Sequence, residues 1–188
     1  MPTPTCFHLA ILPGDGIGPE VVGAALRVLE RLESRLVGVS FDRETIHVGA
    51  GEYLRSGNPL PTAALDRMSA ADAILLGAMG LPEVRWPNGV EMTPQIDIRE
   101  KLDLFNGVRP LRLYHPSHTP LKGYGGAGGK PIDLVIVREN CEGLFAERLT
   151  PRTGGPEAET DTLRITRRGA ERICREAFRL ARRRRAHC

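Results

Sequence analysis

The chain has 188 residues, of which 41% are hydrophobic and 26% are charged, and its formal net charge is +3. This composition is typical of a soluble globular protein, and the length suffices for one domain or for parts of two. The N-terminal segment has no basic start and only a short apolar run. These features exclude a signal peptide and a membrane span there, and they predict a cytoplasmic location.

The first half of the chain predicts strands that alternate with helices. An apolar run at 7–12 predicts a buried strand, and a helix is expected over 19–36. A strand at 40–48, a helix at 62–70 and a strand at 73–76 follow. Because this order is typical of layered sheets, we predict an α/β fold.

The turn GDGIGP joins the first strand to the first helix. Its glycines and free amides could hold a phosphate, but the third glycine of the dinucleotide-binding fingerprint is replaced by Pro19. No acidic residue clearly ends a second strand about twenty residues later. We therefore predict a structural turn in which Asp15 caps the following helix.

The second half of the chain is less regular. A long loop rich in glycine and proline at 77–94 precedes a helix at 97–104 and a strand at 108–113. The segment 132–137 is almost entirely apolar, which predicts a strand that is buried on both faces. The polar stretch 147–165 reads as an extended excursion away from the domain.

The C-terminal segment is strongly basic, with ten arginines from Arg164 onward. We predict a helix over 167–185 that is capped by Thr166 and ends in cations that favour its dipole. Nucleic-acid binding is the alternative, although no known module and no basic–aromatic interleaving accompanies these arginines. The apolar stripe expected to pack against the domain consists of Ala170, Ile173, Cys174, Ala177, Phe178 and Ala181.

The cysteines have no CxxC pair and no zinc-like spacing with histidine, which predicts free thiols in a reducing compartment and no metal site on this chain. They are Cys6, Cys141, Cys174 and Cys188.

Three arginines, Arg99, Arg109 and Arg138, lie in apolar-flanked segments at the ends of predicted elements. A half-buried guanidinium needs an anionic partner, and it binds a carboxylate through two parallel hydrogen bonds. Two interpretations stay open. The arginines form a site for a small molecule with two or more carboxylates, or they form three structural salt bridges. Thr93 and Gln95, shortly before Arg99, could face the same ligand.

Two carboxylates follow Arg138 in the segment VRENCEGLF. Glu139 and Glu142 could act as a general acid and base. Equally, Glu139 could form a fixed salt bridge with the neighbouring Arg138. The sequence does not separate these interpretations.

Four blocks of sequence together resemble one family. ILPGDGIGPEVV, LLGAMGLP, DIREKLDLFNGVRP and VRENCEGLFAE resemble the isocitrate and isopropylmalate dehydrogenases, the metal-dependent β-decarboxylating dehydrogenases. The blocks stand in the family's order and span almost the whole chain, but they match the N-terminal half of the family only. The resemblance implies an incomplete layered α/β sheet of the isopropylmalate dehydrogenase type, which is not a Rossmann fold.

The resemblance also implies the organisation of the chain. Residues 1–104 would be the N-terminal part of a first α/β domain, and residues 105–188 the first part of a second. The excursion at 147–165 would be an arm that joins two subunits of a homodimer. No nucleic-acid or membrane partner is implied.

The implied activity is the oxidation of a malate-type 2-hydroxy acid by NAD or NADP, followed by loss of CO2. Candidate substrates are 3-isopropylmalate, isocitrate and tartrate. In this family Arg99, Arg109 and Arg138 would hold the substrate carboxylates. Thr93 and Gln95 would contact the substituent that differs between substrates, and polar residues there favour a polar group.

The loop that would face the nicotinamide cofactor contains Gly80, Leu81 and Pro82. Two departures from the family bear on catalysis. Phe145 occupies the position of a tyrosine, and a phenyl ring cannot donate a proton. The lysine base and the aspartates that bind Mg2+ or Mn2+ in the family are absent from this chain.

We therefore expect a truncated dehydrogenase that is inactive alone. The alternative is a non-catalytic, carboxylate-binding regulatory partner of a full-length dehydrogenase.

Overall fold

The computed structural model of the chain divides into two units, Met1–Ile98 and Arg99–Cys188, and each is described by itself. The domain boundary expected after residue 104 stays a prediction. In the described part of the chain, no helix has both the length and the apolar character needed to cross a membrane. The described residues are 5–125, 128–145, 157–158 and 160–188.

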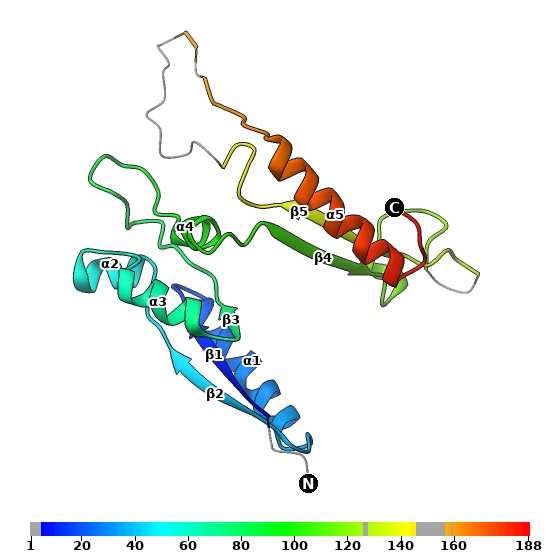
Figure 1. Ribbon diagram of the computed structural model, residues 1–188, viewed down its shortest axis with the longest axis horizontal. Coiled ribbons are helices and arrows are strands. Elements are labelled where there is room, and N and C mark those ends of the chain that lie inside the picture. The colour runs from blue at the N-terminus through cyan, green and yellow to red at the C-terminus, as the bar shows by residue number, and fades with distance from the viewer. Residues whose placement is uncertain (1–4, 126–127, 146–156, 159) are drawn as a thin grey trace. The chain divides into compact units, whose positions relative to one another are not determined.

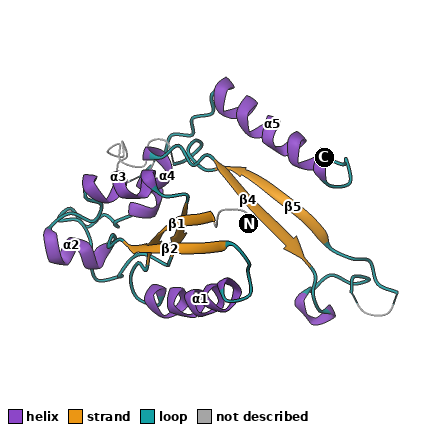
Figure 2. Ribbon diagram, turned by 60° about the horizontal axis from the view of Figure 1, so that its bottom comes forward, coloured by secondary structure: helices purple, strands orange, loops and turns teal. Residues whose placement is uncertain are grey.

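The first unit is built on a three-stranded parallel sheet in the order β2-β1-β3 (Figures 1 and 2). The central strand β1 pairs with both neighbours, so that Leu9 lies opposite Arg43 on β2 and opposite Ala73 on β3. Parallel strands joined by helices confirm the predicted α/β class. The elements are β1 (Thr5–Leu12), α1 (Gly18–Glu33), β2 (Val39–Thr45), α2 (Ala50–Ser56), α3 (Thr62–Ala70) and β3 (Ala73–Leu76).

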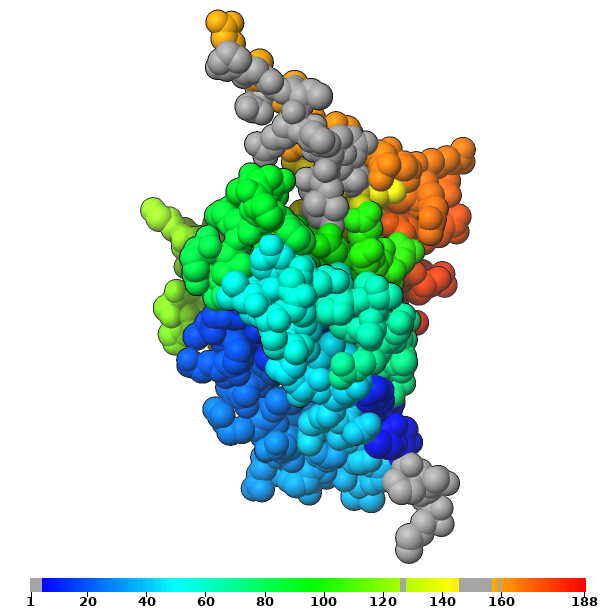
Figure 3. Space-filling model, turned by 90° about the vertical axis from the view of Figure 1, so that its left-hand side faces the viewer, coloured from blue at the N-terminus to red at the C-terminus, as the bar shows by residue number. Residues whose placement is uncertain are grey.

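The core of this unit is aliphatic and is centred on the end of β1, where Ile11 and Leu12 are fully buried. Met68 of α3 and Val22 of α1 are also buried. The helix predicted at 62–70 and the strand at 73–76 are confirmed to the residue. Helix α2 was not predicted, because seven residues are too few to show an apolar period. In the space-filling view α2 and α3, cyan to blue-green, form one continuous surface (Figure 3).

The second unit is a two-stranded antiparallel ribbon with a helix along one face (Figure 2). Thr166 caps that helix as predicted, because its hydroxyl oxygen accepts a hydrogen bond of 3.0 Å from the amide of Gly169. The elements are β4 (Asn106–Arg112), the short 3-10 helix η1 (Pro116–His118), β5 (Asp133–Glu139) and α5 (Arg167–Arg183), and α4 (Pro94–Lys101) runs across the division between the units.

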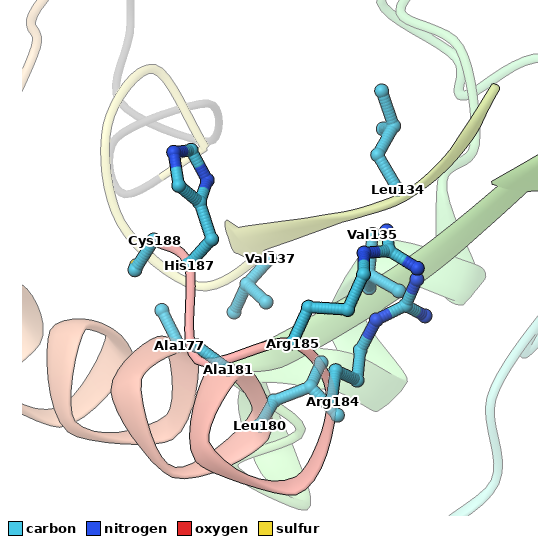
Figure 4. A pocket seen from close by; sticks show the side chains of 10 residues that line it. All are labelled: Leu134, Val135, Val137, Ala177, Leu180, Ala181, Arg184, Arg185, His187 and Cys188. Atoms are coloured by element: carbon cyan, nitrogen blue, oxygen red, sulfur yellow. The ribbon is translucent and has the colours of Figure 1, made fainter. Parts of the chain in front are cut away.

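The prediction that β5 is buried on both faces was wrong. Side chains alternate along the strand, so that Val135 and Val137 face α5 whereas Leu134 points to the other side (Figure 4). Leu134 and Ile136 are 46% and 50% exposed. The reason is that a single helix packs on this ribbon and covers only one face. The uncovered face, which carries Gly107, Arg109 and Leu111 of β4 and Leu134, Ile136 and Arg138 of β5, is called the open face below.

The apolar stripe predicted for α5 was only half right. Ile173, Ala177 and Ala181 are half-buried, but Ala170, Cys174 and Phe178 are exposed, and Phe178 is 61% exposed. The packed face of the helix includes Arg172, which binds an acidic residue of β5. A charged residue therefore occupies a position that an apolar period alone assigns to solvent.

The subunit-joining arm predicted at 147–165 stays a prediction, because residues 146–156 and 159 lie outside the described residues. The base of this excursion is described. Gly143 and Arg164 exchange two backbone hydrogen bonds of 2.8 and 3.2 Å, so the chain leaves and returns at one point.

Candidate functional site

The pairing of β4 with β5 brings two of the three predicted arginines together. Arg109 lies opposite Ile136, and Gly107 lies opposite Arg138. Arg109 and Arg138 are therefore diagonal neighbours on the open face, a relation that places residues roughly 7–8 Å apart. Two guanidinium groups on one strand pair, which no described helix of this unit covers, form the centre of the candidate site.

None of the three arginines is in an ion pair with any residue that the structure describes. Arg109 is exposed, whereas Arg99 and Arg138 are half-buried. The guanidinium carbon of Arg138 lies 5.1 Å from the centroid of the Phe145 ring, which is a cation–π contact. The described contacts therefore give no support to the interpretation that these arginines serve as structural salt bridges.

The covered face of the same ribbon differs in this respect. Glu139 accepts two hydrogen bonds of 3.0 Å from Arg172 of α5, which also donates to Asp103 at 2.7 Å. Hydrogen bonds to these carboxylates raise the pKa of the Arg172 guanidinium above its ordinary value. The centroid of the Phe105 ring lies 4.4 Å from the guanidinium carbon of Arg172. The possible salt bridge between Arg138 and Glu139 was wrong, because adjacent strand residues point to opposite faces.

Glu142 is also engaged in structure. Its carboxylate accepts hydrogen bonds from the amide of Thr166 at 2.8 Å and from its hydroxyl at 2.6 Å. These bonds lower the pKa of Glu142 below its ordinary value. Glu139 and Glu142 both take part in contacts that hold α5 or its cap, so the described contacts give no support to the interpretation of these carboxylates as an acid–base pair.

The third arginine is placed by its backbone. The carbonyl oxygen of Arg99 accepts hydrogen bonds from the amide of Leu104 at 2.7 Å and from the thiol of Cys141 at 3.5 Å. The last turn of α4 therefore contacts the turn that follows Arg138. Burial, and then the charge of Glu139, raises the pKa of this thiol.

The two polar residues predicted to contact the variable substituent lie at the start of α4. Gln95 stands one helical turn before Arg99, and the backbone carbonyl of Thr93 accepts from the amide of Ile96 at 2.9 Å. The carboxamide oxygen of Gln95 is buried and has no hydrogen-bond partner among the described residues. A buried acceptor of this kind needs a donor.

Asp15 does not cap α1, so that prediction was wrong. Its buried carboxylate accepts three backbone hydrogen bonds, from Ala50 and Gly51 at 2.8 Å and from Gly80 at 2.9 Å. The first two are the opening amides of α2, which Asp15 caps instead. Sequence reasoning missed this because the partners lie 35 to 65 positions away. The one sequence feature that agrees with this contact is Gly49, because a Cβ at that position would lie 2.4 Å from the Asp15 carboxylate.

The loop predicted to face the cofactor is thereby fixed to the first strand–helix turn. The amide of Gly80 is used by Asp15, and Leu81 packs against a core cluster of Ala50, Val84 and Met92. Among the described residues no three histidine, cysteine or acidic side chains are placed to hold a metal ion.

A hollow in the second unit lies on the covered face of the ribbon and is not lined by Arg109 or Arg138. It is a cavity of about 420 Å³ between β5 and the end of α5, lined in part by Val135, Val137 and Ala181 (Figure 4). Arg184 and Arg185 line it too, but both bind the carboxylate of Asp133 at 2.5 and 2.7 Å. These arginines are therefore part of the scaffold.

Comparison with known proteins supplies independent information. A family model described as isocitrate/isopropylmalate dehydrogenase matches residues 8–188. A 3-isopropylmalate dehydrogenase from Mycolicibacterium gilvum is 41% identical over 184 residues, which cover 96% of this chain and 51% of that protein. The chain thus spans about half the length of the curated relatives it matches.

Solved structures agree with this match. The crystal structure of an isocitrate dehydrogenase from Methylococcus capsulatus superposes with a TM-score of 0.74 at 32% identity, over 95% of this chain and 48% of that one. A β-decarboxylating dehydrogenase from Thermococcus kodakarensis gives 0.66 at 31% identity, over 95% and 46%.

Proposed function

The chain belongs to the isocitrate/isopropylmalate dehydrogenase family, and from this premise we propose that it supplies the carboxylate-binding part of an NAD- or NADP-dependent oxidoreductase. Its substrate would be a malate-type 2-hydroxy acid, such as 3-isopropylmalate, isocitrate or tartrate, that is oxidised and then loses CO2. Malate-type acids carry two carboxylates close together, which suits two neighbouring guanidinium groups.

The observation that carries this proposal is the open face. Arg109 and Arg138 are diagonal neighbours there and have no acidic partner among the described residues. Six other arginines of the C-terminal segment, by contrast, bind nearby acids, which also weighs against a nucleic-acid-binding tail. They are Arg167, Arg168, Arg172, Arg179, Arg184 and Arg185.

In this proposal the residues of the chain bind and orient the substrate. Arg109 and Arg138 hold carboxylates, and Arg99 adds a third cation from the end of α4. Gln95 offers an acceptor without a partner, which supports a substituent that carries a hydrogen-bond donor. Thr93 would contact the same group.

The nicotinamide cofactor, when bound, would accept a hydride from the hydroxyl-bearing carbon. The loop of Gly80, Leu81 and Pro82 would face it, and its attachment to Asp15 supports a rigid surface. The described residues supply no cluster of metal ligands, so no step is assigned to a metal here. Phe145 has no proton to donate, and the resemblance places the lysine base outside these residues.

We therefore expect these 188 residues to bind a hydroxy acid without turnover when tested alone. A regulatory partner of a full-length dehydrogenase would bind in the same way, and a stable complex with such an enzyme would distinguish it. The homodimer and the cytoplasmic location likewise remain part of the proposal, supported by the family assignment.

The test is calorimetric titration of the chain with malate. Losing one charge-assisted, two-pronged contact costs about 1.5–3 kcal/mol, so Arg109→Met and Arg138→Met should each weaken binding about tenfold or more. Arg112→Met is the matched control, because Arg112 lies on β4 but on the covered side of the ribbon. Lactate, with one carboxylate, should bind more weakly. Equal losses in all three variants, or no malate binding by the wild-type chain, would contradict the proposal.

A further inference from the structure

The open face carries an aromatic ring against one of its two arginines. Phe145 comes seven residues after Arg138, and its ring centroid lies 5.1 Å from the guanidinium carbon. This is inside the range of about 6 Å at which a cation is attracted to the face of a ring. The ring thus contacts Arg138, one of the arginines that have no acidic partner among the described residues.

The chain between these two residues is an organised turn. The amide of Cys141 donates to the carboxylate of Glu139 at 2.8 Å, and Gly143 adopts a left-handed φ of +77°. Gly143 then donates to the carbonyl of Arg164 at 2.8 Å. These bonds hold the backbone of the segment that leads from Arg138 to Phe145.

A ring that stacks on one flat side of a guanidinium would leave its in-plane N–H groups free. Those N–H groups are the ones that bind a carboxylate with two parallel hydrogen bonds. An arginine side chain also loses rotamer freedom when it binds, and a contact that fixes it beforehand removes part of that cost. Phe145 can therefore strengthen carboxylate binding without touching the carboxylate.

We propose that Phe145 is a positioning residue for the carboxylate site, and that its ring holds the guanidinium of Arg138 in the orientation that receives a substrate carboxylate. This inference rests on the proposed function. It gives the aromatic ring at position 145 a role in binding, separate from any role in proton transfer.

The chain contains a matched control for this contact. Arg112 and Tyr114, at the far end of β4, form a second pair of the same kind, with 5.8 Å between guanidinium carbon and ring centroid. Both are exposed, and Arg112 does not belong to the open face. Removing the ring of Tyr114 should therefore leave malate binding unchanged.

The experiment is a double-mutant cycle on the malate dissociation constant. Immobilising one long side chain on binding costs about 1 kcal/mol, so without the ring that fixes Arg138 beforehand Phe145→Leu should weaken malate binding by up to about fivefold, and Phe145→Met should do the same. Phe145→Tyr keeps the ring and should stay within about twofold of the wild type. In an Arg138→Lys background, Phe145→Leu should cause no further loss, because a lysine ammonium is not a planar fork that a ring can align.

The cycle separates this inference from the proposed function. If the wild-type chain does not bind malate, or if Arg109→Met and Arg138→Met bind as well as the wild type, the proposed function fails and the role of Phe145 falls with it. If malate binds through the arginines, the role of Phe145 alone is overturned by any one of three results. These are unchanged affinity in Phe145→Leu and Phe145→Met, a further fivefold loss in the Arg138→Lys background, or an equal loss in Tyr114→Leu.

Discussion

The two faces of the β4–β5 ribbon use arginine in opposite ways. On the covered face Arg172 is 17% exposed and binds Glu139 and Asp103, and Arg184 and Arg185 bind Asp133. On the open face Arg109 and Arg138 stand beside exposed Leu134 and Ile136 and bind none of the described acidic residues.

This difference separates scaffold from site. An arginine and a carboxylate that form an ion pair within the fold neutralise each other, and removing one of them lowers the free energy of unfolding. A guanidinium without an acidic partner among the described residues forms no ion pair within the fold, and it is available to an anionic ligand. Arginines that lie at the two faces of one strand pair can therefore be assigned different roles from their partners.

The largest expected effect comes from breaking the covered face. Arg172→Met leaves the carboxylate of Glu139, 17% exposed, without its partner, and should lower the free energy of unfolding by about 3 kcal/mol. Arg138→Met loses only the contact with the Phe145 ring and should lower it by no more than about 1 kcal/mol. Urea unfolding followed by circular dichroism measures both. Equal losses of stability would remove the distinction between the faces.

A smaller loss of stability is expected from breaking the contact between Glu142, in the turn after β5, and Thr166 at the start of α5. Glu142→Gln weakens two hydrogen bonds to Thr166 and should lower the free energy of unfolding by about 1 kcal/mol at neutral pH. The pKa of Glu142 is lower in the folded chain than its ordinary value of 4.5. Its stabilising effect is therefore complete above the ordinary pKa and is lost as pH falls through the lowered one.

Unfolding measured at pH 7 and at about pH 3 checks this sign, because the wild type and Glu142→Gln should converge as the carboxylate becomes protonated. A difference between the two proteins that grows on acidification would contradict the assigned role. Malate binding at neutral pH should be unaffected by this substitution, since Glu142 does not belong to the open face.

The smallest effect is a difference in thiol reactivity. Burial, and then the charge of Glu139, raises the pKa of Cys141, so iodoacetamide should modify it roughly tenfold more slowly than the exposed Cys174. Arg138→Met should preserve this protection. Arg172→Met should slow the modification further, because the guanidinium of Arg172 lowers the pKa of this thiol. Mass spectrometry of the labelled chain distinguishes the thiols.

The local features of this fold could be predicted from sequence. The apolar run of β1, the helix at 62–70 and the Thr166 cap depend on residues a few positions apart, and all three are confirmed. The three arginines were identified because each interrupts an apolar segment. That Arg109 and Arg138 share a face could not be predicted, because it depends on the register of two strands that are joined by a long connection.

The remaining errors also involve distant partners. Which side of α5 packs on the ribbon depends on the ion pair between Arg172 and Glu139, 33 residues earlier in the chain. The apolar period of the helix does not reveal this pair. Asp15 binds amides far along the chain instead of the helix that follows it. The expectation of a fully buried β5 failed because its composition could not tell whether one or two layers cover the ribbon.

The most direct test observes the arginine side chains while the ligand binds. In a ¹⁵N NMR titration with malate, the Nε–Hε signals of Arg109 and Arg138 should shift and saturate together, whereas that of Arg172 should remain in place. Lactate should produce smaller shifts at higher concentration. Signals of Arg109 and Arg138 that do not move, or that move no more than that of Arg172, would contradict the account of the open face as a dicarboxylate site.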